Sequence, residues 1–460
     1  MPPSLNEWLP EDHLARFVAE VVDQVLDLST IYAGYVGMRG YPPYDPRLML
    51  RLVIYGYTTG VRSSRAIERK CVDDVAFRFL AADQAPDFRS IARFRRRHLT
   101  ALSDLLVQSL QLAQRLGMVK LGRVALDGTK LRANASKHKA MSYDRLVDKE
   151  AAVEAEIAEL EAAAARLLAD AEAVDAAEDA RYGPDSTDRD LPGELGRREQ
   201  RLARLQAARA AIEAEAAERA RATAEAAQRR RQRRAGVDDP DAVAAAGRDA
   251  AERALPEPRA QRNFTDPESR IMKNSDGAFV QAYNAQAVVD EAHQLITAAD
   301  VTDCAADVGC LTPMLDQAAA NTGAHPKQAV MDAGYCSDTN LAAAARRQAE
   351  HGTDMLIATG RLKHGEQIPA PPRGRIPAAA TPRQRMARKL RTKPGRAGYA
   401  RRKAIVEPVF GQIVTVQNGR RLLLRGLAAA RAEWRLLAAC HNLLKVFRYA
   451  GISGLATAIA

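Results

Sequence analysis

Three carboxylates stand where an acid is costly unless a cation compensates it. Asp127 and Asp332 each follow an apolar, strand-like run and each precede small residues. Glu407 is the only acid between residues 367 and 432. If folding gathers these three side chains, they form an oxygen-rich site suited to Mg²⁺. Two ions held there would stabilise the attacking and the leaving oxygen of an in-line phosphoryl transfer on a polynucleotide.

The same residues also allow a plainer interpretation. An Asp at the end of a strand often serves only as a turn former or a helix cap. The separations of the three acids along the chain carry no physical argument by themselves. Residue type and position therefore leave a catalytic site and two structural turns as alternatives.

Positive charge is concentrated in one stretch of the chain. Residues 361–430 hold 17 Lys and Arg against two acids, a net charge of +15. The whole chain has a net charge of +11, so the remainder is slightly acidic. A basic stretch of this kind is typical of proteins that bind a phosphate backbone. DNA, RNA and an acidic membrane surface all satisfy the charge, and residues 361–396 alone also fit a solvated basic loop.

Length and composition limit the class of protein. A chain of 460 residues with 47% hydrophobic and 27% charged residues predicts two to four folded units. No apolar run reaches the roughly 18 residues of a membrane helix, and the first residues lack the apolar core of a signal peptide. The five scattered cysteines include no CxxC pair, which indicates reduced thiols. We therefore expect a soluble, cytoplasmic protein.

The first 117 residues have the apolar spacing of several short helices. Ser63 or Ser64 is expected to cap one of them, and Ser90 another. The second helix carries a basic cluster after a short turn, as in a helix-turn-helix DNA reader. A solvated basic face is the alternative. The cluster comprises Arg93, Arg95, Arg96 and Arg97.

An abrupt change of composition follows a predicted strand over residues 123–135. Residues 144–234 are rich in Ala, Glu and Arg, with apolar residues spaced by alternating fours and threes. Residues 182–193 break this pattern. Two helices joined by such a break predict an antiparallel coiled-coil hairpin with a structural or dimer-forming role. The apolar positions are Val153, Ile157, Leu160, Ala164, Leu167, Ala171 and Val174, then Leu195, Leu202, Leu205 and Ile212.

From residue 275 the pattern predicts a mixed α/β domain interrupted after its first strand by the helical insertion. Two antiparallel strands are expected around a turn at residues 290–293. The elements expected after this hairpin are a helix at 305–320, a strand at 328–331, a helix at 341–348 begun by Ser337 or Asp338, a strand at 355–357, a helix around Glu407 and a last helix at 431–447.

Several longer motifs resemble bacterial insertion-sequence transposases of the DDE class. They are LDGTKLRANASKHKAMSY, NFTDPESRIMKNSDGAFVQAYNAQAVVD, VMDAGYCSD, YARRKAIVEPVFGQI, RRLLLRGL and AEWRLLAACHNLLKV. The N-terminal stretch YPPYDPRLMLRLVIYGYTTGVRSSRAIE shares the resemblance. It implies a ribonuclease-H-like mixed sheet flanked by helices, formed by residues 118–143 and 263–450. An all-helical N-terminal DNA-binding domain (1–117) and the coiled-coil insertion (144–262) complete the expected architecture.

The resemblance implies that Asp127, Asp332 and Glu407 are the catalytic residues and the ligands of Mg²⁺, for which Mn²⁺ can substitute. Asp127 would bridge two ions, and each of the other two acids would bind one. Water would attack first and nick the element end, and the freed 3′-OH would then attack target DNA. This chemistry needs no covalent protein intermediate.

DNA contacts are expected from three groups of basic residues. The family's basic residue one helical turn before the glutamate matches Lys403. Many relatives carry a Lys seven residues after the glutamate, where this chain has Val414, and that Lys contacts transposon-end DNA. Pro408 predicts a bend or a helix end beside Glu407. The three groups are Arg401, Arg402 and Lys403; Arg420, Arg421 and Arg425; and Arg93, Arg95 and Arg96.

The expected partner is double-stranded DNA, namely terminal inverted repeats and target DNA, with a homodimer as an option and no membrane. The protein would be nucleoid-associated when bound to DNA. Two alternatives stay open: a metal-dependent nuclease without strand transfer, and a catalytically decayed DNA-binding relative, which Val414 would fit. His441 and Asn442 on the last helix are interpreted as core polar residues rather than catalytic ones.

Overall fold

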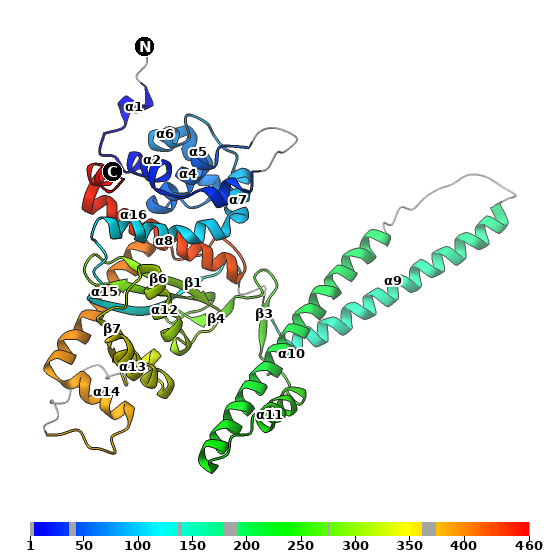
Figure 1. The fold of residues 1–460 in the computed structure, drawn as a ribbon. Coiled ribbons are helices and arrows are strands. Elements are labelled where there is room, and N and C mark those ends of the chain that lie inside the picture. The colour runs from blue at the N-terminus through cyan, green and yellow to red at the C-terminus, as the bar shows by residue number, and fades with distance from the viewer. Residues whose placement is uncertain are drawn as a thin grey trace. The chain divides into compact units, whose positions relative to one another are not determined.

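The computed structural model describes residues 4–35, 43–136, 140–178, 191–274, 276–360 and 374–459 (Figure 1). The chain forms two compact units. The first consists of Met1–Asn134 together with Ser269–Ala460, and the second is Ala135–Glu268. The predicted division of the first unit into an N-terminal domain and a catalytic domain stays a prediction.

The N-terminal part of the first unit is helical, as the apolar spacing predicted. Ser63 caps α5 by accepting the backbone N–H of Ala66, which confirms one predicted cap. The cap predicted at Ser90 is wrong, because Asp87 accepts the N–H of Arg89 and begins the helix three residues earlier. The elements are α1 (Leu5–Trp8), α2 (Leu14–Glu20), a π-helical turn (Val21–Val25), α3 (Ser29–Tyr32), α4 (Pro46–Thr59), α5 (Ser64–Asp73), α6 (Val75–Leu80), α7 (Phe88–Arg97) and α8 (Leu99–Arg115).

A six-stranded mixed sheet follows, in the order β4-β5-β1-β7-β8, with β6 pairing β5. The predicted hairpin is confirmed as β5 and β6, and the strand predicted at residues 328–331 is β7. β5 runs antiparallel to β1, whereas β7 runs parallel to both β1 and β8. The strands are β1 (Arg123–Arg132), β4 (Arg270–Lys273), β5 (Phe279–Asp290), β6 (Ile296–Thr302), β7 (Gln328–Met331) and β8 (Asp354–Ile357).

Helices cover both faces of this sheet. On one face, Val124 and Leu126 of β1 pack in a core with Leu311 of α12 (Leu311–Thr322) and Leu341 of α13 (Asp338–His351). The intervening residues of β1, including Asp127, therefore point to the other face. The remaining helices are α14 (Pro382–Arg391), α15 (Lys393–Thr415) and α16 (Leu427–Ile459), and short 3₁₀ turns lie at Val308–Cys310 and Ala333–Tyr335.

The helix α15 continues through Pro408, so the predicted helix end beside Glu407 is wrong, whereas a bend there stays a prediction. A proline in a helix leaves the carbonyl four residues earlier without its N–H donor. Here that carbonyl belongs to Ala404, and it accepts a hydrogen bond from Nε2 of Gln294 at 3.2 Å. A side chain of the β5–β6 turn thus replaces the lost backbone bond.

The second unit is a helical insertion after β1. α9 (Tyr143–Glu178) packs against α10 (Leu191–Ala235), and α11 (Pro240–Glu252) packs against α10. A small core joins the first two helices and includes the predicted apolar residues Val153, Leu205 and Ile212. Arg209 adds a 2.7 Å ion pair to Glu150. The short strands β2 (Ala140–Ser142) and β3 (Gln261–Asn263) pair at the base of the insertion.

One buried carboxylate joins the N-terminal helices to α16. Glu433 is 1% exposed, and its Oε1 accepts hydrogen bonds from Arg62 Nη2 at 2.5 Å and from Tyr57 Oη at 2.9 Å. Its Oε2 accepts the backbone N–H groups of Leu423 and Leu424 at 2.7 and 2.9 Å. All of these hydrogen bonds are lost or weakened if the negative charge of Glu433 is removed.

We expect Glu433→Gln to lower the free energy of unfolding by about 3–5 kcal/mol, because it leaves the buried Arg62 guanidinium without its counter-ion. Urea denaturation of Glu433→Gln, Arg62→Met and the double variant measures the interaction free energy between these two side chains. Arg431→Gln, which breaks a half-exposed ion pair with Asp300, is the control and should cost less than about 1 kcal/mol. Additive effects of the two buried substitutions would contradict this assignment.

Candidate active site at the strand ends

Asp127 and Asp332 come from neighbouring parallel strands. Leu126 of β1 is paired with Met331 of β7, so the two aspartates are the next residues along adjacent strands. Side chains at matching positions of parallel strands point to the same face. The negative charge of Asp332 contributes to the raised pKa of Asp127. The structure therefore brings these two predicted site residues together.

The carboxylate of Asp127 is largely buried and is compensated by one cation. Its Oδ2 accepts a hydrogen bond from Nη1 of Arg402 at 2.5 Å, and Oδ1 accepts the N–H of Gly128 at 2.9 Å. Burial raises the pKa of Asp127 above its ordinary value, while the positive charge of Arg402 opposes this shift. Arg402 is thus the group that allows an ionised carboxylate at this position.

Asp332 also has the plainer role that its position suggested. Its Oδ1 accepts the backbone N–H of Gly334 at 2.7 Å and caps the 3₁₀ turn that follows β7. Its side chain is only partly buried. A capping role and a ligand role are compatible, because a carboxylate offers about four lone-pair directions.

Glu407 lies on α15 with an exposed side chain. It is five residues after Arg402, which places it ~140° around the helix from the side chain that reaches Asp127. Among the residues that the structure describes, no group of three or more His, Cys, Asp or Glu side chains is arranged to hold a metal ion. The joint site of all three acids therefore stays a prediction.

The basic residues predicted near the site differ in their surroundings. Arg401 pairs with Glu291 at 2.7 Å, and Lys403 is exposed. Arg421 donates to Oδ1 of Asn134 at 2.5 Å. Two further members of the predicted set, Arg420 and Arg425, are exposed in the same segment, which runs beside the C-terminal end of β1.

The arginines of α7 do not form one surface. Arg93 and Arg96 are exposed, as a DNA contact requires. Arg95 is buried, and its guanidinium donates to Tyr57, to the carbonyl of Arg62 and to Ser64. The Arg95 guanidinium therefore lies in the protein interior and is not part of a DNA-binding surface.

A polar cluster beside Gly128 of β1 was missed by the sequence analysis. Oδ1 of Asp307 accepts hydrogen bonds from Asn284 Nδ2 at 2.7 Å, Gln286 Nε2 at 2.9 Å and Lys130 Nζ at 3.2 Å. A Cβ at Gly128 would lie 2.3 Å from Gln286 Nε2, so a larger residue there would displace the Gln286 amide from this cluster. Lys130, within the LDGTK motif, was the one residue of this cluster that a local motif contained. The cluster could not be predicted from it, because its partner Asp307 comes from a distant segment.

The core interpretation of His441 and Asn442 is confirmed. Both are fully buried, and Asn442 exchanges hydrogen bonds with the backbone of Ile296 at 2.8 and 3.0 Å. Nε2 of His441 lies 2.9 Å from the carbonyl of Gln294, and burial lowers the pKa of His441 to about 4. The imidazole is therefore neutral near pH 7.

Two protein-family models match the chain. A transposase domain matches residues 3–97, and a transposase DDE domain matches residues 252–443. Comparison with curated proteins and with solved structures returns no significant match. No helix of the described residues is long and apolar enough to cross a membrane.

These matches support a DNA-processing enzyme with a DDE domain. Such a domain implies a ribonuclease-H-like fold, with which the mixed α/β sheet agrees. The predicted likeness to insertion-sequence DDE transposases is therefore confirmed. Enzymes with this domain generally depend on a divalent metal ion and bind DNA.

The ion pair between Arg402 and Asp127 predicts a pH-dependent contribution to stability. Arg402 stabilises the ionised form of Asp127, so its contribution is present above the pKa of that carboxyl and is lost as the pH falls through it. We expect Arg402→Gln to cost about 1–3 kcal/mol at pH 7 and clearly less near pH 4.

Urea denaturation across this pH range measures the effect. Arg346→Gln on the exposed surface of α13 is the matched control and should change stability little at any pH. A cost of Arg402→Gln that does not vary with pH would show that the side chain acts by packing rather than by charge.

Proposed function

We propose that this protein is a DDE transposase that cleaves DNA at the ends of its element and joins the freed strand to target DNA. The observation that carries the proposal is the placement of Asp127 and Asp332 side by side on adjacent parallel strands, within a matched transposase DDE domain. Asp127 lies within β1 and Asp332 directly follows β7, and a carboxylate beside such apolar strand residues is retained at a cost to folding.

The donor set fits a divalent cation. Carboxylate oxygens are the ligands that Mg²⁺ prefers, and Mn²⁺ accepts the same set. The dependence of Asp127 on the Arg402 guanidinium supports a site built for positive charge. Asp127, Asp332 and Glu407 would hold the ions, which when bound stabilise the attacking and leaving oxygens of phosphoryl transfer.

The basic residues of α15 and of the following segment would position the DNA. Once a bound cation neutralises the Asp127 carboxylate, Arg402 would be released from it. Arg402 is placed to contact a DNA phosphate instead. Arg401 and Lys403 flank it on the same helix. Arg420, Arg421 and Arg425, together with Arg93 and Arg96 of α7, would contact the backbone farther along the duplex.

The helical insertion would act as an antiparallel coiled-coil arm that brings two copies of the protein together. The packing of α9 on α10 and the apolar contacts of Val153, Leu205 and Ile212 support this role. A dimer would allow two element ends to be held at once, with the helical N-terminal domain contributing further DNA contacts.

Substitution of the acids tests the catalytic assignment. We expect Asp127→Asn, Asp332→Asn and Glu407→Gln each to abolish Mg²⁺-dependent cleavage of a terminal inverted-repeat duplex, while leaving DNA affinity largely intact. Asn at position 332 keeps an acceptor for the cap, so loss of activity there would not reflect loss of the turn. Exposed Asp338→Asn and Glu350→Gln serve as matched controls. Full cleavage by any of the three site variants would refute the assignment.

A strand-joining assay distinguishes the proposed transposase from the two alternative functions. A nuclease of the same fold would cut the repeat duplex but never join the 3′-OH to a target plasmid. A decayed relative, which the presence of Val414 at the position of the family's Lys favours, would bind DNA without cutting it in Mg²⁺ or Mn²⁺. Replacement of Val414 by Lys would then increase affinity for the element end.

A further inference from the structure

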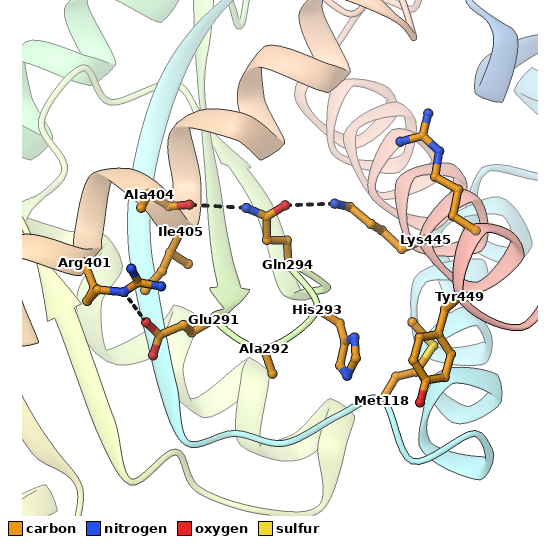
Figure 2. A pocket seen from close by; sticks show the side chains of 11 residues that line it. Met118, Glu291, Ala292, His293, Gln294, Arg401, Ala404, Ile405, Lys445 and Tyr449 are labelled. Carbon is orange, nitrogen blue, oxygen red and sulfur yellow. Dashed lines mark hydrogen bonds and ion pairs between the residues drawn. The ribbon is translucent and has the colours of Figure 1, made fainter.

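A cavity of about 430 Å³ lies beside the β5–β6 turn, between α15 and α16, and the sequence analysis did not single it out (Figure 2). Arg401 and Ile405 of α15 line one side, and Lys445 and Tyr449 of α16 line the other. The cavity is open to solvent and holds basic side chains from two helices that are far apart in sequence.

Positive charge in this cavity exceeds negative charge. Its one acid, Glu291, is already neutralised by Arg123 at 2.8 Å and by Arg401 at 2.7 Å. Lys445 and Arg448 have no carboxylate partner among the residues that the structure describes. Burial and the neighbouring Arg448 both lower the pKa of Lys445, so a bound anion would relieve an existing repulsion.

The ammonium group of Lys445 is held in place by a strained residue. Gln294 has a left-handed backbone with φ of 56°, and its Oε1 accepts a hydrogen bond from Lys445 Nζ at 2.8 Å. The other end of the same amide donates to Ala404, and the Gln294 carbonyl contacts His441 (Figure 2). Strain of this kind persists only where surrounding contacts enforce it, and it is common at binding sites.

The cavity lies on the same side of the sheet as the acids, beside the N-terminal end of β1. Arg123 begins this strand and pairs with Glu291, whereas Asp127 is four residues later, ~13 Å along the strand. Backbone phosphates are farther apart than the 3.4 Å axial rise per nucleotide, because the strand also winds around the duplex. A distance of ~13 Å therefore corresponds to about two nucleotides. On α15, Arg401 faces the cavity while the next residue, Arg402, contacts Asp127.

We propose that this cavity binds a backbone phosphate of the DNA, about two nucleotides from the phosphate that is held at Asp127 and Asp332. Lys445 and Arg448 provide the charge, and Tyr449 forms the exposed wall. This inference rests on the proposed function, since it assigns a second contact to the same DNA strand. It assigns no base readout, because cations that bind phosphates position DNA without reading its sequence.

Salt-dependent DNA binding tests the proposal. Lys445→Met and Arg448→Gln each remove one charge, and Arg346→Gln on α13 is the matched control with the same loss of charge at an exposed site. Anisotropy with a fluorescein-labelled repeat duplex longer than two helical turns gives affinity against salt concentration. Each cavity variant should reduce the salt slope by about 1 and weaken binding roughly fivefold near 0.15 M salt. The control should leave both unchanged.

Neutralised phosphates locate the contact on the DNA. With wild type, one methylphosphonate about two nucleotides from the scissile phosphate should weaken binding, and Arg448→Gln should remove this dependence. Cavity variants that bind like Arg346→Gln would overturn the inference, provided that the wild type binds and cuts repeat DNA. Binding of inorganic phosphate that Arg448→Gln abolishes, with DNA affinity unchanged, would also overturn it. A wild type that neither binds nor cuts DNA would instead overturn the proposed function.

Discussion

A carboxylate on a buried strand requires a positive charge beside it, and the arrangement around Asp127 follows from that requirement. Neighbouring strands supply more negative charge through Asp332, so the compensation must come from outside the sheet. Arg402 of α15 provides this positive charge, and its ion pair with Asp127 ties α15 to β1. The helix that carries the third predicted acid is thus anchored by an ion pair at the first one.

The continuity of α15 depends on a second contact with the sheet. Pro408 follows Glu407 directly and would weaken the helix there, but Gln294 of the β5–β6 turn donates to the carbonyl that the proline leaves unpaired. The same glutamine orients Lys445 of α16. Gln294 therefore contacts both the predicted catalytic helix and the last helix, and it lines the basic cavity between them.

Local patterns predicted most of the elements around the site. The strand that ends at Met331, the hairpin turn after Asp290 and the Ser63 cap agree with the structure, because each depends on residues close together in the chain. The expectations of a DNA contact by Arg95 and of a helix end at Pro408 failed for the opposite reason. The burial of Arg95 and the rescue of the helix at Pro408 depend on partners at least 31 residues and about a hundred residues away, respectively.

The sequence by itself determined the likeness to DDE transposases and the location of the basic segment, and it predicted the three acids, because motif residues and composition are properties of the chain alone. The tertiary structure decided which acids meet: parallel pairing of β1 and β7 places Asp127 beside Asp332, whereas the rotation of α15 leaves Glu407 exposed. It also created the Asp307 cluster and the Lys445 cavity. Side chains from segments more than a hundred residues apart form these sites, and no local pattern records such a pairing.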